Sequence, residues 1–301
     1  MTQSKTYVVD QGWMREKDLA ALITNQPLSK FVIPDVAFVE MSKSGNWEGT
    51  MRPSLYNFRS AATRTFLSLS VGEALAIELE RGKSIEHELL PDSFRDFVQS
   101  LITELGANRE GPAVTRMRAN FSAVFADLLQ NDLLESDAKP RLAGLVEPWL
   151  SGLKPQTLSI LRRQPADDRF RLCLIQANVA HFSKQITKQH GMSDDVSEQY
   201  LDSKPLLLRY VSLFTRHALR WAIQSGWSNV EASRALNHFL DQDYVLIASF
   251  FDELLTKDKE ARLAYEELMI MLSTPLADAV NYCNSILSGS AISDRGPATV
   301  R

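Results

Sequence analysis

The stretch from Asn237 to Asp258 constrains the fold of this chain more than any other. It contains a helix-length apolar segment, then a very short strand at residues 254–256, with Asp241 before the apolar segment and Asp258 after the strand. Because a helix rises only about 1.5 Å per residue, the chain can leave Asp241 along a helix and return along a strand. We therefore expect Asp258 to lie beside Asp241, so that two carboxylates distant in sequence meet in space.

The N-terminal segment predicts a parallel α/β sheet. Residues 7–9 form a short buried strand that ends at Asp10, and residues 30–33 form a second one. A helix over residues 15–24 separates the two strands, and a helix after the second strand carries Glu40. Strands alternating with helices are typical of parallel sheets, whose sites form at the carboxyl ends of the strands. Asp10 lies at one such end and Glu40 lies just beyond another.

The rest of the chain divides into a core and an insertion. Residues 65–69 favour a third strand and residues 71–81 a helix that Gly82 ends, whereas helical segments dominate from about Lys83 to Ser203. Further helices are expected at residues 93–105, 113–134, 165–187, 203–225 and 259–272. We predict a discontinuous core of residues 1–82 and 204–287, a helical insertion of residues 83–203, and a disordered tail of residues 288–301.

Composition limits the class of protein. The 301 residues are 45% hydrophobic, and 33 basic against 37 acidic residues give a net charge of −4, which argues against a chain that simply coats nucleic acid. Cys173 and Cys283 match no metal or disulfide pattern, which indicates a reducing compartment. The chain has no apolar signal core and no run of about 20 apolar residues. We therefore expect a cytoplasmic protein with no membrane partner.

Acidic residues form the candidate site. The set is Asp10, Glu40, Asp241 and Asp258, with Asp243 in reserve. Carboxylate oxygens are hard ligands that suit Mg²⁺ or Mn²⁺, and four of them brought together without a cation would repel one another. A divalent ion removes that repulsion, activates a water and stabilises the charge of an in-line phosphoryl displacement. The acids therefore suggest metal-dependent phosphodiester hydrolysis.

These motifs resemble those of the PIN-domain nuclease family. The resemblance rests on YVVD ending at Asp10, on FVIPDVAFVEM with Glu40, and on DQDYVLIASFFDELLTKD with Asp241 and Asp258. In PIN proteins one acid follows strand one and another lies in the helix after strand two. A third opens a helix, and a fourth follows a hydrophobic-hydrophobic-Thr-x-Asp ending. The resemblance covers the two ends of the chain, and the middle departs from it because a compact PIN domain has no insertion of this length.

The resemblance implies a fold and a function. The fold would be a three-layer PIN-like core with a central parallel sheet, to which the large α-helical insertion is added. The function would be that of a Mg²⁺- or Mn²⁺-dependent nuclease, an RNA endonuclease that cuts single-stranded or structured RNA with water held by the four acids. PIN relatives also imply a toxin-like role, a homodimer and an inhibitory protein partner.

Several assignments stay open at this stage. Asp241 and Asp243 compete for one ligand position, and Asp241 is favoured because Asp243 shares a helix face with apolar residues. Asp258 is equally well explained as the N-cap of the following helix. Thr256, Asn237 and Ser54 are candidates for substrate contact or for support of the acids, and each is also explained as a structural residue.

Two further functions compete with the nuclease. The first is a non-catalytic PIN-like module whose insertion binds a protein partner, and the second is a metal-dependent phosphatase acting on a small substrate. A basic groove built from the arginines of the insertion, Arg171 among them, would favour a nucleic acid, although Asp167 and Asp168 interrupt that group.

Overall fold

The sheet has four short parallel strands. A computed structural model describes residues 4–42, 46–120, 151–163, 167–224 and 232–288. The strands are β1 (Thr6–Val9), β2 (Lys30–Ile33), β3 (Thr65–Leu67) and β4 (Glu253–Leu255), in the order β3-β2-β1-β4. Val8 lies opposite Val32 on one side and Leu254 on the other. The α/β class is confirmed, with the C-terminal strand lying beside the N-terminal one.

The sequence of the strands explains their central position. Val8, Val9, Phe31, Val32 and Ile33 are all fully buried. Strands of a parallel sheet are covered on both faces, so they are near-continuous apolar runs rather than alternating ones. The strand predicted at residues 30–33 is confirmed, and residues 7–9 lie within β1.

Two strands differ from the prediction at their ends. β3 ends at Leu67 rather than at residue 69: the N–H of Ser68 still donates to the carbonyl of Ile33, but that of Leu69 donates to the carbonyl of Leu89 outside the sheet. β4 covers residues 253–255 rather than 254–256. Thr256 follows the strand and is buried, and its hydroxyl oxygen accepts a hydrogen bond from the backbone N–H of Asp258.

Helices make up most of the described chain. They are α1 (Lys17–Asn25), α2 (Asp35–Ser42), α3 (Trp47–Leu55), the 3-10 helix η1 (Tyr56–Arg64), α4 (Val71–Arg81), η2 (Glu86–Glu88), α5 (Asp92–Gly106), α8 (Pro155–Leu161), α9 (Asp168–Gln189), α10 (Asp194–Asp202), α11 (Leu206–Gln224), α12 (Ala232–Ala248), α13 (Lys259–Ser273) and α14 (Leu276–Leu287). The helix predicted at residues 71–81 is confirmed as α4. Ser70 caps its start by accepting from the N–H of Glu73, and Gly82 ends it with a left-handed φ of 61°.

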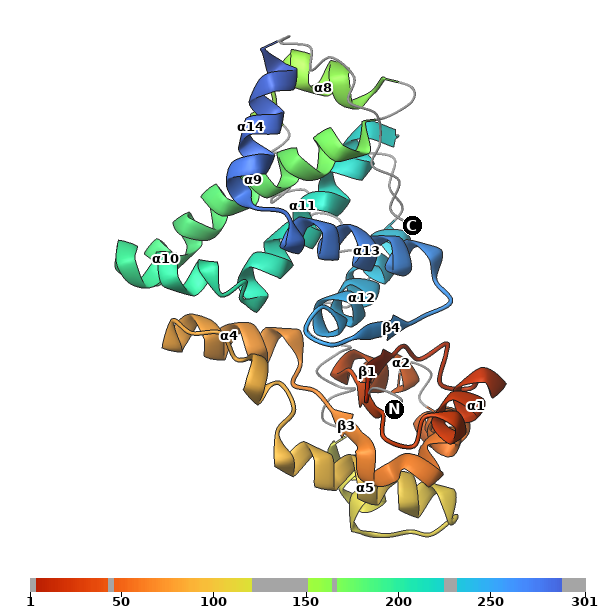
Figure 1. Cartoon of the computed structure of the whole chain (residues 1–301). Coiled ribbons are helices and arrows are strands. Elements are labelled where there is room, and N and C mark those ends of the chain that lie inside the picture. Colours follow the sequence, from red (N-terminus) through yellow and green to blue (C-terminus); the bar gives the residue numbers. More distant parts are fainter. Residues whose placement is uncertain (1–3, 43–45, 121–150, 164–166, 225–231, 289–301) are drawn as a thin grey trace.

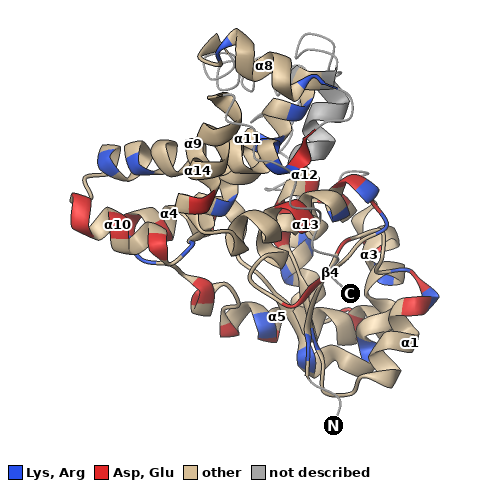
Figure 2. Ribbon diagram, turned by 45° about the horizontal axis from the view of Figure 1, so that its top comes forward, with Lys and Arg blue, Asp and Glu red and all other residues tan. Residues whose placement is uncertain are grey.

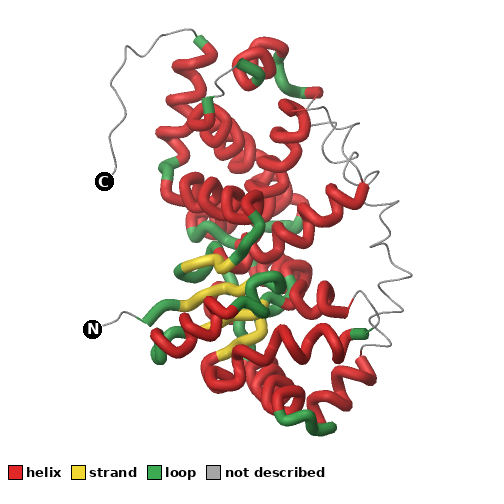
Figure 3. Tube along the Cα trace, turned by 90° about the vertical axis from the view of Figure 1, so that its right-hand side faces the viewer, coloured by secondary structure: helices red, strands yellow, loops and turns green. Residues whose placement is uncertain are grey.

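The helices form two groups around the sheet. In Figure 1 the strands and α5 lie in the lower half, while α8, α9 and α14 lie at the top. Viewed from the side, helices lie above and below the stacked strands (Figure 3). α9 packs against α11, α13 and α14, so residues from the predicted insertion and from the C-terminal part of the chain share one helical layer.

One helix of the predicted insertion packs beside the sheet rather than with the other helices of the insertion. α5 belongs to residues 83–203 by sequence, yet it packs against β3, η1 and α3, beside the sheet. Val98, Leu101 and Ile102 of α5 are fully buried. The domain boundaries stay a prediction, and most of the segment predicted as a disordered tail, residues 289–301, lies outside the described residues.

Candidate functional site

Asp10 lies where β1 ends. Its backbone N–H still donates to the carbonyl of Leu255 over 3.1 Å, so the ladder with β4 fixes its position. Its Oδ1 accepts from the N–H of Trp13 over 2.8 Å, and the Thr256 hydroxyl also bonds to the carboxylate. The pKa of Asp10 is raised because burial disfavours the charged form, and the negative charge of Asp258 adds to that rise. The hydrogen bonds act in the opposite direction. Asp258 therefore lies close enough to Asp10 for its negative charge to act on the Asp10 carboxyl group.

Asp258 follows β4 and begins α13. Its Oδ1 accepts from the N–H of Glu260 over 2.6 Å and from that of Ala261 over 2.8 Å, so it is the N-cap of this helix. Its own N–H donates to the Thr256 hydroxyl oxygen over 3.0 Å. Both capping bonds use one oxygen, and within the described residues Oδ2 accepts no hydrogen bond. The structural explanation of Asp258 thus holds, and one carboxylate oxygen is still directed to solvent or ligand.

Glu40 is bound by a tyrosine that the sequence analysis did not single out. The Tyr244 hydroxyl donates to Oε2 of Glu40 over 2.6 Å, and the tyrosine side chain is buried. The pKa of Tyr244 lies well above its usual value, first because of burial and then because of the charge and hydrogen bond of Glu40. The charge of Asp10 raises it further. Tyr244 therefore contacts Glu40 directly and lies within reach of the charge of Asp10.

The sequence did contain a signal for Tyr244. It is three residues after Asp241 on the same helix, where it begins an otherwise apolar segment. A buried phenol needs a hydrogen-bond partner. What the sequence does not reveal is that this partner lies on α2, more than two hundred positions earlier.

Asp241 lies on the side of α12 that faces α13. It lines a small void together with His217, Glu260 and Ala261. Glu260 and Ala261 are also the residues whose N–H groups bind Asp258. Asp241 therefore borders the first two turns of α13, the helix that Asp258 caps, and the expectation that the two carboxylates lie side by side stays a prediction.

Asp243 lies on a different side of α12 and faces Asp35. The two carboxyl groups line a cavity of about 210 Å³ near the ends of β2 and β3, together with Ser70 and apolar side chains. Burial, followed by the charge of Asp35, raises the pKa of Asp243 to about 7. Asp243, held in reserve as a metal ligand, thus forms a pair with Asp35.

The residues predicted to support the acids do not lie together: Thr256 lies beside Asp10 and Asp258, whereas Ser54 lies on α3. Thr256 is buried, and its hydroxyl bonds to the side chain of Asp10 and accepts from the backbone N–H of Asp258; its role in supporting the acids stays a prediction. Ser54 is fully buried on α3, where it accepts from Nε of Arg15 over 3.0 Å and donates to the carbonyl of Thr50. A substrate cannot reach a hydroxyl in that position, so Ser54 instead ties α3 to the loop after Asp10. The side chain of Asn237 lies outside the described residues.

The acids fit a hydrated divalent cation only as a pair. Among the residues that the structure describes, no group of three or more His, Cys, Asp or Glu side chains is arranged to hold a metal ion. Mg²⁺, however, keeps several waters and commonly takes one or two carboxylates plus substrate phosphates. Of the predicted acids, Asp10 and Asp258 best meet this requirement, because the charge of Asp258 acts on Asp10 and Oδ2 of Asp258 accepts no hydrogen bond from the described residues.

The arginines of the insertion do not behave as one basic groove. Arg171 is buried, and its Nη2 donates to Oε1 of Glu267 over 2.5 Å. Arg118 is bonded to Glu48 and Glu110. Basic and acidic segments are interspersed over the described helices (Figure 2). A phosphate-tracking groove therefore cannot include Arg171, because its charge is already neutralised in the interior.

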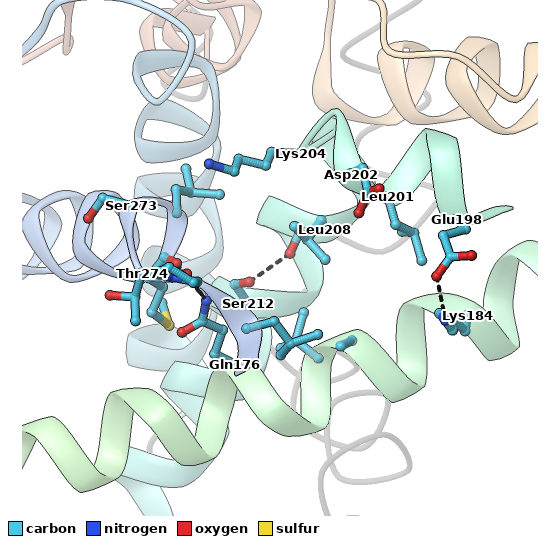
Figure 4. A pocket seen from close by; sticks show the side chains of 16 residues that line it. Gln176, Lys184, Glu198, Leu201, Asp202, Lys204, Leu208, Ser212, Ser273 and Thr274 are labelled. Carbon is cyan, nitrogen blue, oxygen red and sulfur yellow. Dashed lines mark hydrogen bonds and ion pairs between the residues drawn. The ribbon is translucent and has the colours of Figure 1, made fainter. Parts of the chain in front are cut away.

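A separate cavity of about 310 Å³ lies among the helices, where α9, α10 and α11 meet the turn between α13 and α14. Figure 4 shows Gln176 beside Thr274, whose carbonyl accepts from its amide over 2.5 Å, and the Lys184–Glu198 ion pair at another side of the cavity. None of the predicted acids lines it.

Comparison with known proteins leaves the PIN resemblance as a prediction. No protein-family model, no curated protein and no solved structure matches the chain. Within the described residues, no helix is both long enough and apolar enough to cross a membrane.

Proposed function

We propose that the carboxyl edge of the sheet is a Mg²⁺- or Mn²⁺-dependent site that hydrolyses phosphodiester bonds, with RNA as the substrate. The observation that carries the proposal is the convergence of Asp10, Asp258 and the Glu40–Tyr244 pair at the ends of adjoining elements. Sites of parallel sheets form at this edge. Asp10 after β1, Glu40 in the helix after β2 and Asp258 after β4 also have the positions that the resemblance to PIN proteins implies.

The residues of the chain have distinct roles in this proposal. Asp10 and Asp258 hold the cation, and Thr256 fixes their relative position by bonding to both. Tyr244 keeps its proton because its pKa is raised, so it holds Glu40 as a hydrogen-bond donor. A bound divalent ion would supply an activated water and neutralise charge on the phosphate. Asp241 on α12, which borders the start of α13, is the further acid of the proposed set.

A non-catalytic binding module is the second candidate. The observation in its favour is that Asp258 caps a helix and Glu40 bonds to Tyr244, so each acid also has a purely structural role. Neither role needs a metal. Such a module would bind its partner without cutting RNA.

The test is hydrolysis of three substrates by the purified chain with Mn²⁺, with Mg²⁺ and with a chelator. The substrates are a single-stranded RNA, a DNA of the same sequence and a chromogenic phosphomonoester. Cutting of RNA that stops with the chelator supports the proposal, and hydrolysis of the monoester alone would favour the phosphatase. Turnover of none of them contradicts the enzyme and favours the binding module.

A further inference from the structure

Buried charges on three helices form a network behind the candidate site. Arg216 on α11 is fully buried, and its Nη1 donates to Oε1 of Glu260 over 2.7 Å while its Nε donates to Glu267. Arg220, one turn later, donates to the same oxygen of Glu260 over 2.6 Å. Arg171 on α9 binds the other end of the network at Glu267. α9, α11 and α13 are thus joined by charge-assisted hydrogen bonds.

Burial makes the geometry of this network rigid. A charge taken out of water is costly unless it is paired and hydrogen-bonded, and Arg216 and Glu267 are both buried. Each guanidinium is a planar fork that fits a carboxylate in few orientations. Arg216 binds two carboxylates that lie on the same face of α13, about two turns apart, so it fixes both the position and the rotation of that helix.

The network ends at the residue that binds Asp258. The side chain of Glu260 is held by Arg216 and Arg220, while its backbone N–H donates to Oδ1 of Asp258 over 2.6 Å. Ala261, the next residue, makes the second capping bond. Any shift of Glu260 relative to α11 therefore moves the two donors that orient the Asp258 carboxylate.

We infer that Arg216 and Glu260 are positioning residues for Asp258: the helical layer clamps the first turn of α13 and so holds the Asp258 carboxylate beside Asp10. The inference rests on the proposed function, since it concerns the same site. It also gives the predicted insertion a role, because α9 contributes Arg171 to the network. That role is to anchor the site rather than to carry the substrate.

The test compares Glu260→Gln with wild type. The substitution keeps the shape of the side chain and the N–H that Asp258 accepts, but it removes the charge that the two arginines bind. We expect hydrogen exchange of the amides at residues 260 and 261 to become about tenfold faster, the factor that corresponds to the loss of one charge-assisted hydrogen bond. Arg220→Gln, at a position where the side chain is partly exposed, is the second variant and is expected to act in the same direction.

Glu73→Gln is the matched control. Glu73 also lies in the first turn of a helix with a side-chain N-cap, but that cap is Ser70 of α4. This control removes the same favourable charge at a helix N-terminus without touching the network. Exchange at residues 260 and 261 is expected to be unchanged in it.

The second measurement is Mn²⁺ affinity, determined by calorimetry at a temperature where all variants are folded. Glu260→Gln and Arg220→Gln are expected to bind Mn²⁺ about tenfold more weakly, and Glu73→Gln to bind it as wild type does. Unchanged exchange in both variants overturns the inference, and so does faster exchange with unchanged Mn²⁺ affinity. If wild type binds no Mn²⁺, the proposed function fails, and exchange alone decides whether the network holds Asp258.

Discussion

The Tyr244 hydroxyl lies 2.6 Å from Oε2 of Glu40 and joins α12 to α2 at the edge of the sheet. Asp10 is near enough for its charge to raise the tyrosine pKa as well. Because burial and two carboxylates all oppose ionisation, the phenol stays protonated and donates to Glu40. The orientation of one predicted acid therefore depends on a residue from the far end of the chain.

Replacing Tyr244 with phenylalanine tests this relationship. Tyr244→Phe keeps the buried ring and leaves Glu40 without its donor. A hydrogen bond to a charged group contributes about 1.5–3 kcal/mol, and we expect a loss near the lower value because Glu40 is only half-buried. Urea denaturation at pH 7 measures the change. Tyr56→Phe, at an exposed position, is the control, and equal stability of the two variants would show that the bond contributes nothing.

Alanine substitution of two glycines, Gly72 within α4 and Gly82 at its C-terminal end, should change the free energy of unfolding in opposite directions. Gly82 has a φ of 61°, and a Cβ there would lie 3.3 Å from Cγ1 of Val196. Gly82→Ala should therefore lower the free energy of unfolding by about 1 kcal/mol or more. Gly72 lies within the same helix, and a Cβ there would meet nothing within 4 Å.

Gly72→Ala should consequently raise the free energy of unfolding by about 0.5–1 kcal/mol, because alanine restricts the unfolded chain and favours helix. Thermal unfolding of both variants beside wild type checks the pair. A loss at both positions, or at neither, would contradict the assigned backbone geometry of α4.

The Asp35–Asp243 pair predicts a pH dependence of stability. The pKa of Asp243 is raised to about 7, so the folded protein keeps this proton after the unfolded chain has lost it. Folding therefore binds a proton between about pH 4 and pH 7, and the contribution of this group to stability falls as pH rises through that window.

Asp243→Asn should remove that dependence. The variant should match wild type near pH 4 and exceed its stability at pH 8 by on the order of 4 kcal/mol, since each pKa unit corresponds to about 1.4 kcal/mol. Urea midpoints from pH 4 to pH 8 measure the difference, with Asp18→Asn on the exposed face of α1 as the control. Parallel pH profiles for Asp243→Asn and wild type would show that the carboxyl is ionised in the folded state.

Local sequence patterns predicted the elements that bring the acids together. The apolar strands at residues 30–33 and 7–9, the helix at 71–81 and its glycine stop are all encoded by neighbouring residues, so they could be identified without the fold. The position of Asp258 after β4 followed in the same way. Parallel pairing then placed its carboxylate beside the end of β1.

Side-chain partnerships between distant elements could not be predicted. Nothing near Ser54 in the sequence indicates that Arg15 donates to its hydroxyl, and nothing near Arg171 indicates that Glu267 neutralises it from another helix. The Asp243–Asp35 and Tyr244–Glu40 pairs could not be predicted for the same reason, because each joins residues of two different helices. Helix periodicity shows which face a residue occupies, but the residue that covers this face is set by the packing of whole helices.

The central claim is that Asp10 and Asp258 act as one acidic site. Metal-dependent cleavage of single-stranded RNA by wild type, Asp10→Asn and Asp258→Asn tests it most directly. Asparagine caps helices as well as aspartate does, so Asp258→Asn should stay folded. We predict that each substitution lowers the cleavage rate at least about a hundredfold, because each removes a charged ligand of the cation. Cleavage that survives in both variants at the wild-type rate would contradict the account.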